Sequence, residues 1–427
     1  MFILRFDSLD MKYDVAIIGS GIVGLSTAFH LSEKHSDLKI AVIDKFHTYA
    51  QGNTGKSAAG FRDVFSSDTS FKLSSSSIRF YDHVQRILGI DLGMKHVGYL
   101  FLMDNESASE TMEEIGRKTK IEEIGLDRLA DLGISVRPDA DVKDVMGLDD
   151  IRKAYLAHNA GIMEPDKIAA FYYNQCVNRN IDFLFGTNVQ SLNLVPEKPL
   201  DYPGEPFIWQ DKTIGSINTD RGEISADTFV LATDVWTNFL TDPVGIDSHI
   251  RPKKRQLFKI RNEFIEAIVG RKVLSTESFP FTVFPKGVYI RPSPAERTFW
   301  AGVADDIGRD FSFVEDPQPE PHFYTYNVYQ VLQAYMKPVA SASVTGMWAG
   351  YYSYNTIDGN PYIFRTLNLI VATGTSGSGI MKGDAIGRVA TALYDGEEKA
   401  KLYDGMRINT ADLGVKSRHV EEEKLVL

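Results

Sequence analysis

Four residues near the start of the chain have the types and spacing that bind a dinucleotide. Gly19, Gly21 and Gly24 follow an apolar run that ends at Ile18, and Asp44 ends a second apolar run 20 residues after Gly24. The first glycine permits a tight turn, the second lets the backbone approach a pyrophosphate, and the third lets a helix pack closely on a strand. The helix N–H groups would bind phosphate and the acid would bind a ribose. The alternative is a glycine turn that serves packing alone.

The residues that follow Asp44 favour FAD over NAD. The chain continues into a polar, glycine-containing loop, residues 51–62, where a further strand and helix would complete a nicotinamide site. A second strand–glycine–helix pattern occupies residues 369–380. A helix N-terminus there would stabilise the negative charge that a reduced flavin carries.

Hydrophobic periodicity predicts the elements that position these residues. Alternating apolar residues indicate strands of a second sheet at 98–103 and 281–302, and an aromatic-rich helix is expected at 324–336. We expect residues 196–222 to form an irregular loop or hairpin, and the tail from Arg418 to be a solvated helix or disordered. The remaining expected elements are strands at 39–43, 181–185, 189–194 and 228–232 and a helix at 167–178.

Composition limits the class of protein. The 427 residues include 46 basic and 57 acidic side chains, a net charge of −11, and one cysteine. This length predicts two domains, interleaved because the glycine patterns lie far apart. One thiol excludes a disulfide framework and a zinc site of several cysteines, and the histidines show no metal-ligand spacing, so we expect no metal. The acidic balance argues against nucleic acid. No apolar run reaches the length of a membrane span. Met1–Asp10 reads as a peripheral extension, or as the product of a start codon upstream of Met11. It shows no small-residue cleavage site, so a cytoplasmic location is expected.

Taken together, these motifs resemble the D-amino-acid oxidase superfamily of FAD-dependent oxidoreductases. The branch that it resembles contains the sarcosine oxidases, dimethylglycine dehydrogenases and dye-linked L-proline dehydrogenases. The resemblance covers nearly the whole chain. Its motifs are the first glycine pattern, the loop 52–62, and residues 227–236, 251–258, 288–292, 348–361 and 374–379.

The resemblance implies an α/β fold in which a Rossmann-like FAD-binding domain is interleaved with a substrate domain built on a large mixed or antiparallel sheet. The expected FAD-binding domain comprises residues 11–90, 155–245 and 342–412. The expected substrate domain comprises 91–154 and 246–341, with 1–10 and 413–427 as peripheral extensions. The residues expected to contact FAD are Gly19, Gly21, Ile22, Val23, Gly24, Asp44, Lys45, Thr54, Gly55, Lys56, Ser57, Ala58, Val189, Ala232, Thr233, Trp236, Gly374, Gly377, Ser378, Gly379, Ile380 and Met381.

Four residues are candidates for the substrate site. Arg62 resembles the carboxylate-binding arginine of sarcosine oxidases, and its alternative role is a surface or helix-capping arginine. Arg291 resembles an arginine of glycine and D-amino-acid oxidases, but its position is shifted by one residue. On a strand, a shift of one residue moves the side chain to the other face of the sheet. Tyr289 lies on the same face as Arg291 and would line the pocket or belong to the core. Ser378 replaces a histidine of the family at the flavin.

Departures from the family pattern refine the expected chemistry. The family's flavin-linking cysteine has no counterpart, so FAD is expected to be noncovalent, and Cys176 is expected to be buried and structural. Phe299-Trp300 takes the place of the lysine that activates oxygen, which favours a dehydrogenase over an oxidase, although Lys286 could substitute. Met381 in place of a lysine favours a cyclic or bulkier secondary amine.

The predicted reaction is oxidation of the C–N bond of an amino acid, or of an N-alkyl or cyclic amino acid, by hydride transfer to flavin N5. The alternatives are a hydrogen-peroxide-producing oxidase of sarcosine or glycine type, and a flavin-binding subunit or assembly protein without its own amine oxidation. The electron acceptor is left open, and an oligomer or a multi-subunit complex is a possible assembly.

Overall fold

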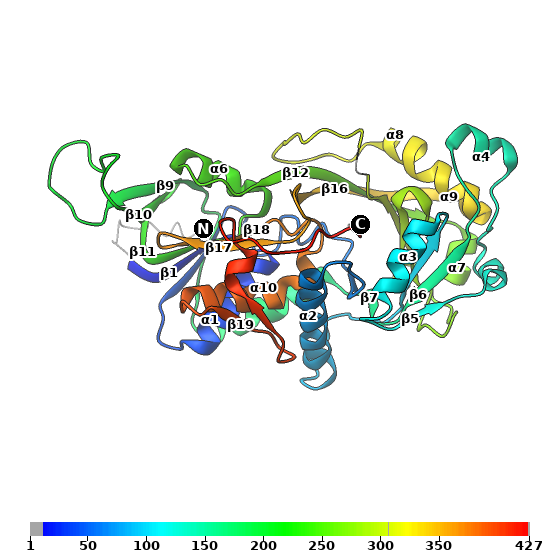
Figure 1. The fold of residues 1–427 in the computed structure, drawn as a ribbon, viewed down its shortest axis with the longest axis horizontal. Helices are drawn as coiled ribbons and strands as arrows, with labels where there is room; N and C mark the ends of the chain where they lie inside the picture. The colour runs from blue at the N-terminus through cyan, green and yellow to red at the C-terminus, as the bar shows by residue number, and fades with distance from the viewer. Residues whose placement is uncertain (1–11, 306, 426–427) are drawn as a thin grey trace, which may run out of the picture. The chain divides into compact units, whose positions relative to one another are not determined.

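The computed structural model describes residues 12–305 and 307–425 (Figure 1). The expectation for Met1–Asp10 falls outside these residues. The chain divides into two compact units, each built from three stretches. Unit 1 takes its described residues from Met1–Gly55, Asp166–Arg251 and Ser353–Val420, and unit 2 takes its own from Lys56–Pro165, Pro252–Tyr352 and Glu421–Leu427.

Unit 1 contains a mixed sheet whose central strands are parallel. β1 (Lys12–Ile18) lies between β11 (Gly222–Leu231) and β2 (Ile40–Asp44), and pairs in parallel with both. The parallel set continues outward with β18 (Leu369–Thr373) beside β11 and β8 (Asp182–Phe185) beside β2. Antiparallel strands β17 (Tyr362–Thr366), β10 (Lys212–Thr219) and β9 (Val189–Pro196) extend the sheet. The residues of β1 and β2 form near-continuous apolar runs because parallel strands are covered on both faces.

Helices α1 (Ile22–Lys34) and α10 (Gly379–Tyr394) pack against each other in unit 1 (Figure 1). A buried ion cluster joins them: His30 Nε2 lies 2.7 Å from Asp384 Oδ1, and Arg388 Nε lies 2.8 Å from Asp384 Oδ2. Burial raises the pKa of Asp384, but the nearby His30 and Arg388 outweigh it and lower the pKa overall. The unit also contains α5 (Pro165–Val177), α6 (Thr237–Thr241), and the short pair β19 (Lys399–Lys401) and β20 (Arg407–Asn409).

Unit 2 is built on an eight-stranded mixed sheet. Its strand order is β16 (Ser343–Asn355), β12 (Ile250–Arg261), β15 (Thr298–Val303), β14 (Val288–Ser293), β13 (Phe281–Val283), β4 (Tyr99–Met103), β6 (Lys153–Ala157) and β5 (Ile121–Glu123). β13 and β4 pair in parallel, whereas the pairs β14–β15 and β4–β6 are antiparallel. A separate two-stranded ladder joins β3 (Gly60–Arg62) to β7 (Ala160–Ile162).

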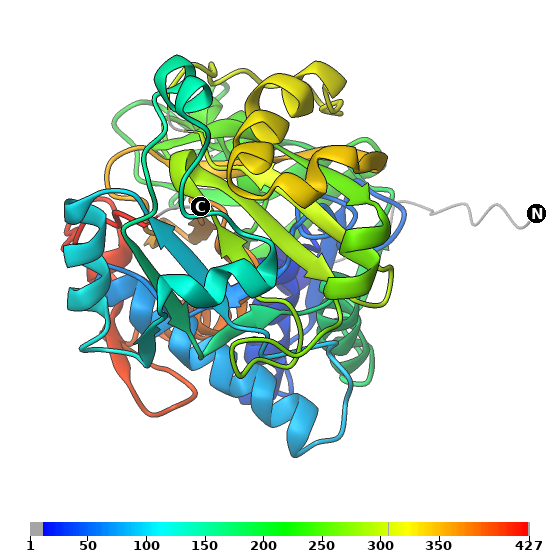
Figure 2. The same ribbon diagram turned by 90° about the vertical axis from the view of Figure 1, so that its right-hand side faces the viewer.

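Both faces of the unit 2 sheet are buried. Along β4, Leu100 and Leu102 join one apolar cluster, while Tyr99, Phe101 and Met103 join the other, as the two-residue period of a strand requires. Helices α8 (Pro321–Phe323) and α9 (Tyr329–Tyr335), yellow in Figure 2, lie on either side of a π-helical turn at Tyr324–Val328, and residues of α9 and of that turn belong to the first cluster. The other helices of the unit are α2 (Asp68–Arg86), α3 (Glu106–Ile115), α4 (Ala140–Met146) and α7 (Glu263–Ile268).

One local expectation is confirmed and two need correction. The stretch 196–222 takes the hairpin form of the two that were expected: β10 pairs antiparallel with β9 on one side and with β11 on the other. The expected helix at 324–336 is interrupted, with a π turn before α9. The tail from Arg418 to Leu425 contains no helix. It is also not wholly exposed to solvent, because Glu423 is buried. Among the described residues, no helix is long and apolar enough to cross a membrane.

Candidate functional site

The first glycine turn in unit 1 has a geometry that only glycine fits. Gly19 has φ +103°, and a Cβ atom there would lie 2.4 Å from the carbonyl oxygen of Ala232. A Cβ atom at Gly24 would lie 1.9 Å from the carbonyl oxygen of Gly19, so α1 can approach β1 only when position 24 has no side chain. These two glycines therefore fix the position of the α1 N-terminus.

The N-terminus of α1 is suited to bind an anion. Its N-cap residue is Gly21, which has no side chain to accept from the helix, and its first turn contains no acid. The N–H of Ile22 donates to Thr54 Oγ1 at 3.1 Å. A Cβ atom at Gly21 would meet only that hydroxyl, at 3.2 Å, so the approach to the helix end stays open. The helix dipole and its first N–H groups favour phosphate there.

Asp44 lies beside this helix end. Its carboxylate accepts hydrogen bonds from Ser20 N at 2.7 Å, Ser20 Oγ at 2.6 Å and Phe46 N at 2.9 Å. A carboxylate offers about four acceptor positions, so one remains for a ribose hydroxyl. The ribose-binding role of Asp44 stays a prediction.

The second glycine loop repeats the anion-binding pattern at α10. Gly374 and Gly377 have φ +69° and +84°, and the N-cap Ser378 donates its hydroxyl to the Thr375 carbonyl at 2.8 Å and does not cap the helix. The first turn contains no acid, and Ile380 and Met381 are buried in it. The N-cap residue of α10 therefore makes no side-chain cap, as Gly21 makes none at α1.

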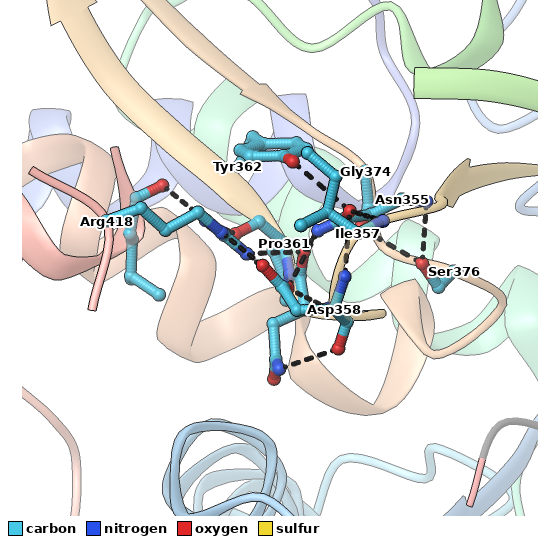
Figure 3. Close-up of polar contacts among 10 residues, drawn as sticks. Asn355, Ile357, Asp358, Pro361, Tyr362, Gly374, Ser376 and Arg418 are labelled. Carbon is cyan, nitrogen blue, oxygen red and sulfur yellow. Dashed lines mark hydrogen bonds and ion pairs between the residues drawn. The ribbon is translucent and has the colours of Figure 1, made fainter. Parts of the chain in front are cut away.

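A polar network supports the α10 loop (Figure 3). The backbone N–H of Asn355 donates to Ser376 Oγ at 3.0 Å, and Asn355 Nδ2 donates to Asp358 Oδ1 at 2.8 Å. Arg418 binds Asp358 through Nε at 2.5 Å and Nη2 at 2.6 Å, and its guanidinium lies 4.1 Å from the centre of the Tyr362 ring. Arg418 therefore connects a distant part of the chain to the loop 374–379.

Replacing Arg418 by methionine is expected to lower the free energy of unfolding by about 3 kcal/mol, because it leaves the Asp358 carboxylate buried without its cation. Urea denaturation of the full chain measures this change. The matched control is Arg365→Met, since Arg365 is exposed and donates only to the carbonyls of Leu393 and Tyr394. Equal effects of the two substitutions would contradict the role of the Arg418–Asp358 pair.

The other residues expected to contact FAD fall in both units. In unit 1, Lys45 Nζ lies 3.9 Å from the ring centre of Trp236, and Thr233 Oγ1 lies 3.0 Å from Thr237 Oγ1. Val189 begins β9 and packs on the unit 1 core. The expected contacts that belong to unit 2 are Lys56, Ser57 and Ala58.

Asp234 was missed from the sequence. It follows Thr233 with φ +49°, and its Oδ2 accepts from Asn53 Nδ2 at 2.5 Å. Burial raises the pKa of its carboxyl group. An aspartate in a left-handed conformation next to a glycine-rich turn is uncommon, but no sequence signal separates such a residue from an ordinary loop aspartate.

Arg62, in unit 2, is a buried cation with neutral partners. It is 3% exposed, and its guanidinium donates from Nη1 to the Val64 carbonyl and from Nη2 to the Leu425 carbonyl, the latter at 2.6 Å. It also lies 4.2 Å from the Phe65 ring centre. No carboxylate among the described residues forms an ion pair with it. Burial lowers the pKa of this guanidinium, and the electrostatic influence of Tyr99 and Glu423 raises it only in part, so a bound anion would make its environment more favourable.

Arg291 has a different environment in unit 2. It is fully buried, and it donates from Nε to the Ala58 carbonyl at 2.9 Å and from Nη2 to the Met163 carbonyl at 3.1 Å. Glu164 Oε1 lies 3.4 Å from Nη2, and the guanidinium lies 4.1 Å from the Trp300 ring centre. Its hydrogen bonds and stacking connect separate segments of unit 2.

Aromatic hydroxyl groups gather near Arg62. Burial raises the pKa of Tyr99 and of Tyr352, and the charge of Arg62 lowers both only in part. Tyr289 is buried, its ring centre is 5.4 Å from that of Phe281, and burial raises its pKa well above 10. These phenols stay neutral at physiological pH. Tyr99 and Tyr352 were not singled out in the sequence, because single aromatic residues on strands usually belong to a core.

Arg255 is a further residue of this cluster that the sequence did not indicate. Its Nη1 binds Asp305 Oδ1 at 3.0 Å, and its guanidinium lies 5.0 Å from the Tyr352 ring centre. Its Nε is buried and lacks a hydrogen-bond partner within the described part of the chain. In the sequence it belongs to a basic run, Lys253-Lys254-Arg255, that looks like a solvated strand start.

Comparison with known proteins agrees with this geometry. Residues 14–393 match the DAO family, described as FAD dependent oxidoreductases, and the chain belongs to that family. The two helix N-termini, the glycine turn and Asp44 fit FAD, and these residues of unit 1 would hold it. Among the described residues, no group of three or more His, Cys, Asp or Glu side chains could hold a metal ion.

Individual relatives are distant. The chain is 24% identical to the FAD-dependent oxidoreductase domain-containing protein 1 of Xenopus laevis, over 90% of this chain and 80% of that protein. It is 23% identical to the glycine oxidase of Bacillus licheniformis, over 90% and 94%. The L-proline dehydrogenase structure from P. horikoshii has a TM-score of 0.71 at 21% identity, covering 91% of this chain and 95% of that one. The glycine oxidase structure from Geobacillus kaustophilus has a TM-score of 0.72 at 18% identity, covering 96% and 99%. These structures share the fold.

Proposed function

We propose that the protein oxidises the C–N bond of an amino acid, with a preference for N-alkyl or cyclic secondary amino acids. Bound FAD supplies the acceptor for the hydride, at N5 of the flavin ring. The chain's own residues bind the substrate carboxylate, orient the substrate and exclude water from it.

The observation that supports this proposal most directly is the environment of Arg62. This guanidinium is 3% exposed, has main-chain carbonyls as its hydrogen-bond partners, and forms no ion pair with a carboxylate among the described residues. Burying a charge without compensation is costly. A substrate carboxylate would provide the missing anion and bind in a bidentate manner, since an arginine has five N–H donors in a planar fork. Arg291 serves instead as a structural cross-link, because its donors already have partners.

The surroundings of Arg62 favour an apolar substrate body. Leu257, Phe281 and Tyr289 belong to the same buried cluster as Tyr99. Such surroundings suit the methylene groups of a cyclic or N-alkylated amine and also favour the neutral form of its nitrogen, because burial disfavours charge. Hydride transfer requires that neutral form.

We propose a dehydrogenase in preference to an oxidase. Trp300 occupies the position where a lysine would promote reaction with oxygen, and its ring stacks on the Arg291 guanidinium at 4.1 Å. The oxidase alternative stays open through Lys286, which has φ +62° in a short turn before β14. A subunit or assembly role is the remaining alternative: a relative from Arthrobacter named sarcosine oxidase subunit beta is 22% identical over 62% of this chain. We also propose a cytoplasmic location, and the proposal names no electron acceptor.

The decisive experiment is anaerobic bleaching of the flavin by a panel of amines. L-Proline, sarcosine and dimethylglycine are expected to reduce the flavin faster than glycine or D-amino acids, and amines without a carboxylate are expected to react poorly. Stopped-flow absorbance measures the rates. The bleached protein should then reoxidise slowly in air, and reoxidation within seconds would favour the oxidase. No bleaching by any amine would overturn the proposal in favour of a flavin-binding subunit.

FAD is expected to be released when the protein is precipitated with acid. Cys176, the one thiol of the sequence, is buried in α5, and burial raises its pKa to about 12. A thiol in this state is a poor nucleophile toward flavin. Absorbance of the supernatant measures the released FAD. Flavin that stays with the pellet after washing would contradict noncovalent binding.

A further inference from the structure

The segment 421–425 of unit 2 docks on the connection between β3 and α2. The carboxylate of Glu423 accepts four hydrogen bonds from this connection: Oε1 from Ser66 N at 3.0 Å and Ser66 Oγ at 2.9 Å, and Oε2 from Ser67 N at 3.0 Å and Ser67 Oγ at 2.8 Å. Within the segment, Leu425 N also donates to Glu423 Oε1 at 3.0 Å. Lys424 N donates to Ser66 Oγ at 2.7 Å. Glu423 is 6% exposed, so these contacts are shielded from water.

The electrostatics of this docking site favour an acid. Ser67 is the N-cap residue of the 19-residue helix α2, so the Glu423 carboxylate lies at the positive end of the helix dipole. Glu421 Oε2 accepts from the N–H of Asp68 at 2.9 Å in the same first turn. Glu422, between the two, is exposed. Glu423 is therefore the buried anchor of the segment.

The anchored segment reaches Arg62. The Leu425 carbonyl accepts from Arg62 Nη2 at 2.6 Å, while the Val64 carbonyl accepts from Nη1. Because the guanidinium is planar, two carbonyls fix its orientation and occupy two of its five N–H groups. Three donors remain, enough for a bidentate carboxylate. The Leu425 side chain packs on the apolar cluster that contains Tyr99.

We infer that Glu423 is a positioning residue for the carboxylate clamp: it anchors the segment whose Leu425 carbonyl orients Arg62. The inference rests on the proposed role of Arg62 in binding the substrate carboxylate. Glu423 acts through Arg62 and does not itself touch substrate. Without the anchor, the Leu425 carbonyl would no longer fix the orientation of the Arg62 guanidinium. A carboxylate would then bind more weakly, because its binding would have to order the Arg62 side chain.

The test compares Glu423→Ala with Glu422→Ala in the full-length, FAD-loaded protein. The probes are propionate and propionamide, which have nearly the same shape but differ in charge. Ligand-observed NMR measures the dissociation constant of each. We expect Glu423→Ala to weaken propionate about tenfold and to leave propionamide unchanged, which a general loss of structure would not do. Glu422→Ala should match the unsubstituted protein. Glu423→Gln, which keeps one carbonyl acceptor, should fall between them and serves if the alanine variant does not fold.

Hydrogen exchange separates this inference from the proposed function. The amides of Ser66, Ser67 and Lys424 should be protected in the unsubstituted protein and should lose protection in Glu423→Ala. Unchanged propionate binding in that variant would overturn the inference while leaving the Arg62 clamp intact. Tighter propionate binding would also overturn it, because the segment would then compete with the ligand. If the unsubstituted protein binds propionate no better than propionamide, the clamp itself fails, and the inference fails with it.

Discussion

Replacing Arg62 by methionine is expected to lower kcat/KM for carboxylate-bearing amines by about 100-fold. Removing one partner of a buried, hydrogen-bonded charge pair typically costs 2–5 kcal/mol, and about 3 kcal/mol corresponds to two powers of ten in rate. Methionine keeps much of the apolar volume of the side chain. Flavin bleaching by L-proline and by pyrrolidine, which lacks the carboxylate, measures the effect, and only the reaction of L-proline should slow.

The matched control for Arg62 is Arg291→Met. The donors of Arg291 bind the carbonyls of Ala58 and Met163, and its guanidinium stacks on Trp300, so its replacement should lower stability. In the fraction of the variant that folds, Arg291→Met should leave the preference for L-proline over pyrrolidine unchanged. If Arg291→Met abolished that preference and Arg62→Met did not, the two assignments would have to be exchanged.

Replacing Gly24 by alanine is expected to lower the free energy of unfolding by about 3 kcal/mol or more. The added methyl group would lie 1.9 Å from the Gly19 carbonyl oxygen, a backbone atom that cannot move aside cheaply. Forcing an extra methyl into a packed site costs typically 1–3 kcal/mol, and this contact lies at the severe end. Urea denaturation of the FAD-free protein measures the change, so that loss of the cofactor does not contribute to it.

Gly21→Ala provides the contrast on the same turn. A methyl group there would meet only Thr54 Oγ1, at 3.2 Å, so the FAD-free protein should unfold at nearly the same urea concentration as before. Binding of FAD should weaken, because the methyl group occupies the approach to the α1 N-terminus. Titration of the FAD-free protein with FAD, followed by flavin fluorescence, measures the affinity. Unchanged affinity would contradict the placement of the pyrophosphate at this helix end.

Local sequence patterns predicted much of unit 1. The glycine spacing, the apolar runs of β1 and β2, and the acid at position 44 each depend on residues close in sequence. The structure agrees with them because a tight turn and a buried parallel strand restrict the allowed residues strongly. The sequence left β10 undecided between an irregular loop and a hairpin for the opposite reason. Its residues, KTIGSINT, are mostly small and polar, so they carry a weak strand signal, and pairing with β9 and β11 determines its conformation.

The sequence by itself determined the cofactor class, because a dinucleotide site is built from a short contiguous motif whose backbone geometry excludes most side chains. It could not distinguish the surroundings of the two candidate arginines. Arg62 and Arg291 look equivalent as residue types, and only tertiary contacts show that Arg291 has a nearby carboxylate and that Arg62 has neutral carbonyls. The docking of Glu423 on Ser66 and Ser67 also required the fold, since these residues are more than 350 positions apart and no local pattern encodes such a contact.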